Sequence, residues 1–352
     1  MKKLIISIGT LRNGGAERIV SEISAMFCDH FLEVVILTWI EAPVFYTLDK
    51  RIRLVCAERE CGSGNRIRQA IWVRSFVKKE HPAVFLSFLM PFNMLSIVAL
   101  GGIKTRVVVC ERQDPSVVKT PLARFLRNIL YHFAARVEVQ TQDGKSYFDR
   151  FLQYKIAVIP NPTHISRAQR DNAMATLKKP RIVTVGRLIH LKNQALLIDA
   201  FARVHSKFPE YTLDIYGDGE LKQSLQNKID ADGLSHYARL CGITNDVPGS
   251  IASAQVFVLS SNVEGMPNAL MEAMALGIPC ISTDVSGVRD IIDDGVNGYV
   301  VPIGDRKAMA DKMQILIESD DLRREFSDKS DNIFERFDRE NIFRQWLDLV
   351  SF

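Results

Sequence analysis

The fold is decided by the stretch Val256-Phe-Val-Leu-Ser-Ser-Asn-Val-Glu264-Gly-Met-Pro267-Asn-Ala-Leu-Met-Glu272-Ala-Met-Ala-Leu-Gly277-Ile-Pro279. Its first four residues are β-branched, aromatic or aliphatic and predict a buried strand. A polar loop follows, and Pro267 stands where a short helix is expected to begin. Gly277 follows the expected last turn, and Pro279 prevents the helix from continuing. The stretch therefore predicts a strand, a loop and a helix in succession.

The start of this helix is a candidate anion site. The first N–H groups of a helix have no partner within it, and the aligned peptide dipoles leave partial positive charge there. We expect these N–H groups to bind an anion such as a phosphate: Asn268, Ala269 and Leu270. Gly265 leaves room on the approach to them.

Two carboxylates flank this helix start. Glu264 lies in the loop, and Glu272 lies about one turn inside the helix. A ligand with phosphates in the middle and hydroxyls at both ends, such as a nucleotide sugar, would suit this arrangement. Taken alone, an E-x7-E spacing more often marks two solvated acids on an ordinary strand–loop–helix.

With E-G-M-P-N and A-L-G-I-P around them, the two glutamates resemble the signature of retaining glycosyltransferases of family 4. The resemblance runs from the first strand to the last helix. It implies an α/β protein of the GT-B fold, with two Rossmann-like, doubly wound domains facing across a cleft. It also implies that Glu264 and the residues after it contact the donor: Gly265, Met266, Pro267, Asn268, Ala269, Leu270 and Glu272.

Length and composition describe a globular protein of two domains. The chain has 352 residues, of which 47% are hydrophobic and 24% charged, as is typical of soluble folds. It contains no run of eighteen apolar residues that would predict a transmembrane helix. The six cysteines lack C-x2-C spacing and predict buried thiols in a reducing compartment. We therefore expect a cytoplasmic protein without structural zinc.

Alternating strands and helices predict mainly parallel, doubly wound sheets. The expected strands are 4–8, 33–37, 53–56, 84–87, 106–110 and 136–140, and then 181–185, 211–216, 256–259, 280–282 and 299–301. We expect an N-terminal, acceptor-side domain over 1–165 and a nucleotide-sugar domain over 178–339. The polar segment 163–179 is interpreted as a linker, and a short helix is expected at 288–292. The family resemblance places the last helix, 340–352, with the first domain.

The N-terminal half is basic. Residues 1–165 hold 23 Lys and Arg against 14 Asp and Glu, a net charge of +9, which favours an anionic partner. Two amphipathic helices are expected there, a basic one over 65–79 and an apolar one over 121–133. Each is open to two interpretations, contact with a membrane surface or ordinary packing against the core. The half has no recognition helix or interleaved aromatic platform, so nucleic acid is not an expected partner.

Two further N-terminal motifs belong to the candidate site. Gly14 and Gly15 form a glycine pair between the first strand and its helix, which suits close approach to phosphates. The resemblance places this loop at the cleft, with Gly15 on the donor side and Gly14 on the acceptor side. Glu111 and Arg112 follow the fifth strand and are expected on the acceptor side. Relatives carry Glu-His there, so the arginine puts an imidazole role in doubt and could contact a phosphate instead.

In the second half, V-G-R-L-x-x-x-K-N matches a family motif position for position. Gly186 allows a turn, while Arg187 and Lys192 place two cations near one strand end. Such cations would neutralise a diphosphate as it leaves. The resemblance adds further donor-site positions at two later strand ends: Gly217, Gly242 and Ile243. The catalytic set is therefore Arg187, Lys192 and Glu264.

These residues predict a retaining glycosyltransferase that moves a hexose or N-acetylhexosamine from a UDP-sugar. No Asp-x-Asp motif occurs, so neither a metal nor another cofactor is expected. Charge and resemblance predict a lipid-diphosphate-linked saccharide as acceptor, in the assembly of capsule, O-antigen or another glycan. They also predict peripheral binding to the anionic inner face of the cell membrane. A non-catalytic partner subunit and a nucleotide-sugar epimerase of the same fold remain alternatives, and a glycoside hydrolase would leave the cations unexplained.

Overall fold

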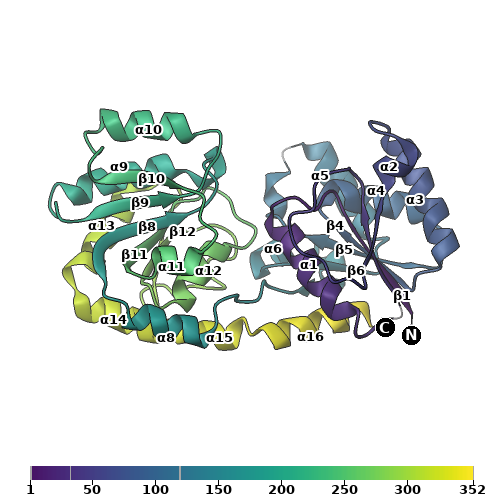
Figure 1. The fold of residues 1–352 in the computed structure, drawn as a ribbon. Helices are drawn as coiled ribbons and strands as arrows, with labels where there is room; N and C mark the ends of the chain where they lie inside the picture. The colour runs from purple at the N-terminus through teal and green to yellow at the C-terminus, as the bar shows by residue number, and fades with distance from the viewer. Residues whose placement is uncertain (1, 32, 119, 352) are drawn as a thin grey trace. The chain divides into compact units, whose positions relative to one another are not determined.

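The structure is a computed structural model that describes residues 2–31, 33–118 and 120–351. The chain divides into two compact units, residues 1–161 with 340–352, and residues 162–339. In each unit, helices cover a parallel sheet on both faces (Figure 1). The final helix, α16 (Arg339–Val350), is almost wholly part of the N-terminal unit.

In the described part of the N-terminal unit, seven parallel strands lie in the order β3-β2-β1-β4-β5-β6-β7. They are β1 (Lys3–Ile8), β2 (Glu33–Thr38), β3 (Arg53–Cys56), β4 (Val84–Phe88), β5 (Arg106–Glu111), β6 (Arg136–Val139) and β7 (Ile156–Val158). The helices between them are α1 (Gly15–Phe27), α2 (Ala57–Cys61), α3 (Arg66–Glu80), α4 (Met90–Leu100), α5 (Pro121–Tyr131), α6 (Gln142–Ser146) and α7 (Arg150–Gln153), with a 3-10 turn η1 (Pro115–Val117).

The second unit has a six-stranded parallel sheet in the order β10-β9-β8-β11-β12-β13. Its strands are β8 (Lys179–Val185), β9 (Thr212–Tyr216), β10 (Ala238–Gly242), β11 (Ala254–Leu259), β12 (Cys280–Thr283) and β13 (Tyr299–Val301). Its helices are α8 (Arg167–Ala175), α9 (Gln194–His205), α10 (Lys222–Ala231), α11 (Val247–Ile251), α12 (Asn268–Ala275), α13 (Arg306–Glu318), α14 (Asp320–Lys329) and α15 (Ile333–Arg336), with 3-10 turns η2 (His190–Lys192) and η3 (Ser330–Asn332).

Both sheets are hydrophobic on both faces. The central strands β1 and β11 are almost entirely buried, as expected where helices cover a parallel sheet from both sides. This is why the apolar runs in the sequence are short and nearly continuous. All eleven expected strands are present with ends that differ by at most two residues, and the α/β fold class is confirmed.

The sequence missed two strands and misjudged one helix. The strands β7 and β10 lie at sheet edges. A strand that pairs on one side only needs fewer apolar residues, so its sequence signal is weaker. Residues 288–292, expected to be helical, form consecutive turns because Ile291 and Ile292 both donate to the carbonyl of Val288. One such turn does not continue into a helix.

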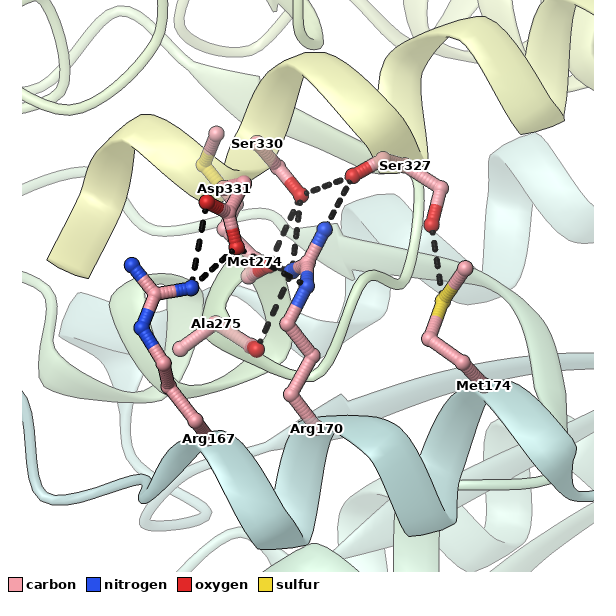
Figure 2. A network of polar contacts seen from close by, with 8 residues as sticks. All are labelled: Arg167, Arg170, Met174, Met274, Ala275, Ser327, Ser330 and Asp331. Atoms are coloured by element: carbon pink, nitrogen blue, oxygen red, sulfur yellow. Dashed lines mark hydrogen bonds and ion pairs between the residues drawn. The ribbon is translucent and has the colours of Figure 1, made fainter.

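The expected linker over 163–179 is largely a folded helix. Ser166 begins α8 with a capping box, in which its hydroxyl accepts from the N–H of Gln169 and the Gln169 side chain accepts from the N–H of Ser166. Arg170 reaches from α8 to the C-terminal end of α12 in the same unit, where its guanidinium donates to the carbonyl oxygens of Met274 and Ala275 (Figure 2). The polar composition of this segment predicted a linker. Composition counts Arg170 as polar, although its side chain is buried and packs against other parts of the unit.

Candidate functional site

The second unit places the predicted donor residues at the switch point of its sheet. In the order β10-β9-β8-β11-β12-β13, the chain moves outward from β8 in one direction and from β11 in the other. Open α/β sheets bind ligands in the crevice outside the carboxyl ends of such neighbouring strands. The loop 186–193 follows β8 and the loop 260–267 follows β11. Gly186, Arg187 and Lys192 lie in the first loop, and Glu264 lies in the second.

A direct ion pair joins these two loops. Lys192 Nζ lies 2.6 Å from Oε1 and 2.8 Å from Oε2 of Glu264. The Ser261 hydroxyl donates to Glu264 Oε1 at 2.6 Å. The side chains of Lys192 and Glu264 are 22% and 9% exposed, so the carboxylate is held in place while the ammonium keeps an open side. Two of the three predicted catalytic side chains are thus in contact.

Polar residues that the sequence analysis did not single out fix the two loops against each other. The N–H of Asn262 donates to the carbonyl of Leu191 at 2.8 Å. The hydroxyl of Ser260 donates to the carbonyl of Lys192 at 3.0 Å. Asn193 adopts the left-handed conformation, caps α9, and donates from its amide to Asn262 at 3.0 Å. The signal for these roles was a Ser-Ser-Asn run directly after a buried strand.

Arg187 is held by its backbone and leaves its side chain exposed. Its carbonyl accepts a hydrogen bond from the buried side chain of Gln194 at 2.9 Å. Among the described residues, the Arg187 guanidinium has no hydrogen bond or ion pair with the protein. A charged group presented in this way can pair with an anionic ligand without first breaking an internal contact.

The helix α12 begins at Asn268 and ends in a Schellman motif. Gly277, at φ +73°, donates to Met274, and Ile278 donates to Ala273. The N-terminal end corrects one prediction: the N–H of Asn268 donates to Met266, and the N–H of Leu270 donates to Pro267. Two of the three expected donors are therefore already used by the tight turn, since the proline cap brings these carbonyls close.

The N–H of Ala269 has no backbone partner among the described residues. It is the group at this helix start that fits the predicted role in anion binding. The flanking residues Gly265 and Glu272 are half-buried, and Glu272 lies in the second turn of α12.

Gly217 allows the loop after β9 to contact the loop after β8. Its φ is +143°, and a Cβ there would lie 1.9 Å from the carbonyl oxygen of Gly186. Its N–H donates to the carbonyl of Gly242 at 2.8 Å. The absence of a side chain at Gly217 therefore lets the backbone of the loop after β8 approach closely, and the expected role of Gly217 in donor binding stays a prediction. Gly242 also has a positive φ, and Ile243 beyond it is exposed.

In the N-terminal unit, Gly14 and Gly15 lie at the start of α1. Gly14 is the N-cap in an extended conformation, and a Cβ there would meet the carboxylate of Glu17. The carbonyl of Gly14 accepts from the hydroxyl of Tyr46. This glycine therefore makes room for a side chain at the helix start.

Glu111 and Arg112 are buried, which corrects their expected role. Arg112, with its side chain 1% exposed, donates to Glu138 at 2.5 Å and also to Asn161. Its guanidinium lies 5.7 Å from the ring centre of Trp346 on α16. An arginine enclosed in this way ties strand ends to the last helix and does not reach an acceptor phosphate. The sequence could not show this because its carboxylate partner lies 26 residues further along the chain.

Glu111 is 3% exposed and accepts a hydrogen bond from the hydroxyl of Tyr131. Burial raises the pKa of Glu111 to about 7, against the lowering effects of Tyr131 and Arg127. In the unfolded chain this carboxyl ionises at a lower pH. The folded state therefore holds one more proton than the unfolded state between the two pKa values, and stability falls as pH rises through that window.

We expect Glu111→Gln to remove this loss of stability. At about 1.4 kcal/mol per pKa unit, wild type should lose about 3 kcal/mol relative to the variant between pH 4.5 and 7. Urea unfolding followed by tryptophan fluorescence measures it, since Trp39, Trp72 and Trp346 all belong to the N-terminal unit. A difference in unfolding free energy that stays constant with pH would contradict the assignment.

Residues 2–31, 33–118 and 120–351 contain no group of three or more His, Cys, Asp or Glu side chains placed to hold a metal ion. Over the same described ranges, no helix is both long and apolar enough to cross a membrane.

Comparison with known proteins shows similarity to glycosyltransferases. Residues 166–332 match the family "Glycosyl transferases group 1". An N-acetylgalactosaminyltransferase of Campylobacter jejuni, named for a GalNAc-containing diNAcBac-PP-undecaprenol acceptor, is 28% identical over 100% of this chain and 99% of its own. The amylovoran biosynthesis glycosyltransferase AmsD of Erwinia amylovora is 26% identical over the full length of both chains.

Among solved structures, HepE of Anabaena in complex with UDP and glucose is similar with a TM-score of 0.82, at 18% identity and full coverage of both chains. This likeness shows the GT-B fold. Most of the second unit therefore matches the family Glycosyl transferases group 1, and the chain as a whole is a glycosyltransferase of the GT-B fold.

Proposed function

We propose that the protein transfers a hexose or N-acetylhexosamine from a UDP-sugar to a lipid-diphosphate-linked saccharide, with retention of anomeric configuration and without a metal ion. The observation that carries this proposal is the group of Arg187, Lys192 and Glu264 at the carboxyl ends of β8 and β11. Two cations and one fixed carboxylate at a sheet switch point suit a diphosphate next to a sugar ring.

In the proposed reaction, the bond between the anomeric carbon and the diphosphate breaks first. Arg187 and Lys192 stabilise the negative charge that develops on the leaving diphosphate. Glu264 lies against Lys192 and would face the sugar, where its carboxylate stabilises positive charge near the anomeric carbon. The acceptor hydroxyl attacks from the face that the diphosphate leaves, and its proton passes to a phosphate oxygen. This step needs no protein nucleophile.

The relatives support the choice of substrates. The name of the Campylobacter jejuni relative describes a saccharide linked through a diphosphate to undecaprenol, and AmsD is named for the biosynthesis of amylovoran. HepE was crystallised with UDP and glucose. For this chain we propose the same classes of donor and acceptor, in the assembly of a surface polysaccharide or glycan. Peripheral binding to the inner membrane surface stays a prediction.

The test is transfer by the full-length protein with a panel of UDP-, GDP- and ADP-sugars and a synthetic lipid-diphosphate-linked saccharide, in the presence of EDTA. We expect one UDP-sugar to be consumed, the product to keep the anomeric configuration of the donor by NMR, and Glu264→Ala to lower turnover by at least about 10²-fold. Activity that requires added metal, or an inverted product, would contradict the mechanism. Release of free sugar without transfer would favour an epimerase or a hydrolase. Absence of nucleotide binding would favour a non-catalytic partner subunit.

A further inference from the structure

The helix α5 exposes an apolar face. Its large apolar side chains recur at every third or fourth position, and one more follows the helix, so they share one side. They are between 41% and 74% exposed, and we call them the α5 stripe: Leu122, Phe125, Leu126, Ile129 and Phe133. The sequence left open whether this helix packs in the core or contacts a membrane. The exposure of the stripe excludes core packing for these side chains.

The opposite face anchors the helix. Arg127 and Tyr131 are fully buried. Arg127 donates to the carbonyl of Pro115 at 3.0 Å and lies 4.9 Å from the ring centre of Phe148. Tyr131 donates to the buried carboxyl group of Glu111. The orientation of α5 is therefore fixed by a polar network, and this network holds the apolar face outward.

The C-terminal end of α5 adjoins a second group of exposed aromatic and basic residues. Lys155 Nζ donates to the carbonyl of His132 at 2.7 Å, just after the helix. Phe151 on α7 and Tyr154, the C-cap of that helix, are exposed. Arg150 lies 4.8 Å from the ring centre of Phe151. Cations beside exposed rings are typical of side chains at a membrane interface, where the ring enters the apolar layer and the charge stays in water.

The residues around the α5 stripe are mainly basic. The helix α5 contains no acidic residue. Residues 121–155 hold six Lys and Arg and three Asp and Glu. Arg127 and Glu138 are fully buried, which leaves five basic and two acidic residues. An exposed apolar face with a basic surround is complementary to a layer of anionic lipid headgroups above acyl chains.

We propose that the α5 stripe docks the protein on an anionic lipid bilayer. The 11-residue helix, about 16 Å long, lies in the plane of the membrane with the stripe at the boundary of headgroups and acyl chains. A second copy of the chain fits this face less well, because a two-fold contact through α5 would bring its basic neighbours together with their own copies. The proposal rests on the exposed face and not on the donor chemistry.

Flotation of the full-length protein with phosphatidylcholine vesicles, with and without 30 mol% phosphatidylglycerol at about 0.1 M salt, tests the proposal. We expect wild type to bind the anionic vesicles and the double variant Phe125→Glu/Phe133→Glu to bind them at least about tenfold more weakly. Leu177→Glu is the matched control, since Leu177 is an apolar residue of the second unit that is 83% exposed. It should bind like wild type.

Circular dichroism checks that each variant is folded, which all are expected to be because the substituted side chains are exposed. Wild-type protein that floats with neither kind of vesicle, or a stripe variant that binds as wild type does, would overturn the proposal. Loss of a dimer in the stripe variant by light scattering, without vesicle binding by wild type, would assign the stripe to a second copy instead. The assay contains neither donor nor acceptor, so its outcome is independent of the proposed reaction.

Discussion

Lys192→Ala is expected to lower kcat/KM for transfer by about 10²–10³-fold, the usual effect of removing a group aimed at charge in a transition state. The Lys192 side chain is expected to have two roles. It fixes Glu264 through both carboxylate oxygens, and its open side would meet the leaving diphosphate. Steady-state kinetics with the donor found in the panel measures the loss.

A double-mutant cycle separates the two tasks. If Lys192 and Glu264 act as one unit, the double alanine variant should be little worse than the poorer single variant, because their effects are not additive. Lys307→Ala is the control, since Lys307 is an exposed lysine of the same unit that is likewise paired with one carboxylate, Asp311. It should keep wild-type kinetics. A Lys192→Ala enzyme within twofold of wild type would refute the proposed role.

Arg170→Ala is expected to destabilise the second unit by about 3–5 kcal/mol, because it removes a buried charged group with several hydrogen-bond partners. The guanidinium donates to the carbonyls of Met274 and Ala275, in the last turn of α12, and to the carbonyl of Ser327 at 2.5 Å (Figure 2). A cation at a helix C-terminus also complements the helix dipole. Its removal takes one donor from each of these carbonyls. The carbonyl of Met274 keeps the N–H of Gly277 and that of Ser327 keeps the hydroxyl of Ser330, whereas the buried carbonyl of Ala275 has no other hydrogen-bond donor among the described residues.

Arg167→Ala is the matched control on the same helix. Figure 2 shows Arg167 one turn away from Arg170, paired with Asp331 at 2.9 Å. Because both partners are substantially exposed, the loss should stay below about 1 kcal/mol. Urea unfolding followed by circular dichroism reports both units, whereas tryptophan fluorescence reports the N-terminal unit. Equal destabilisation by the two variants would contradict the assigned role of Arg170.

The sequence alone predicted the two parallel sheets, whereas the binding of a donor by the candidate residues stays a prediction. Buried parallel strands must be short and apolar on both faces, so each leaves a strong local signal. The segment 256–279 is decided by neighbours in sequence, since its strand, proline cap and glycine end lie within 24 residues. Lys192 after β8 and the carboxylate of Glu264 after β11 do lie together, because parallel neighbouring strands end at the same edge.

Only the tertiary structure decided the roles of side chains whose partners are remote in sequence. Arg112 looked like a ligand contact and is a buried clamp, because Glu138 and Trp346 enclose it. Arg170 looked like part of a linker and holds the end of α12. The α5 stripe carries the same periodicity whether it packs inward or faces solvent. Local patterns show that a helix has two faces, and only packing against other segments determines which face is buried.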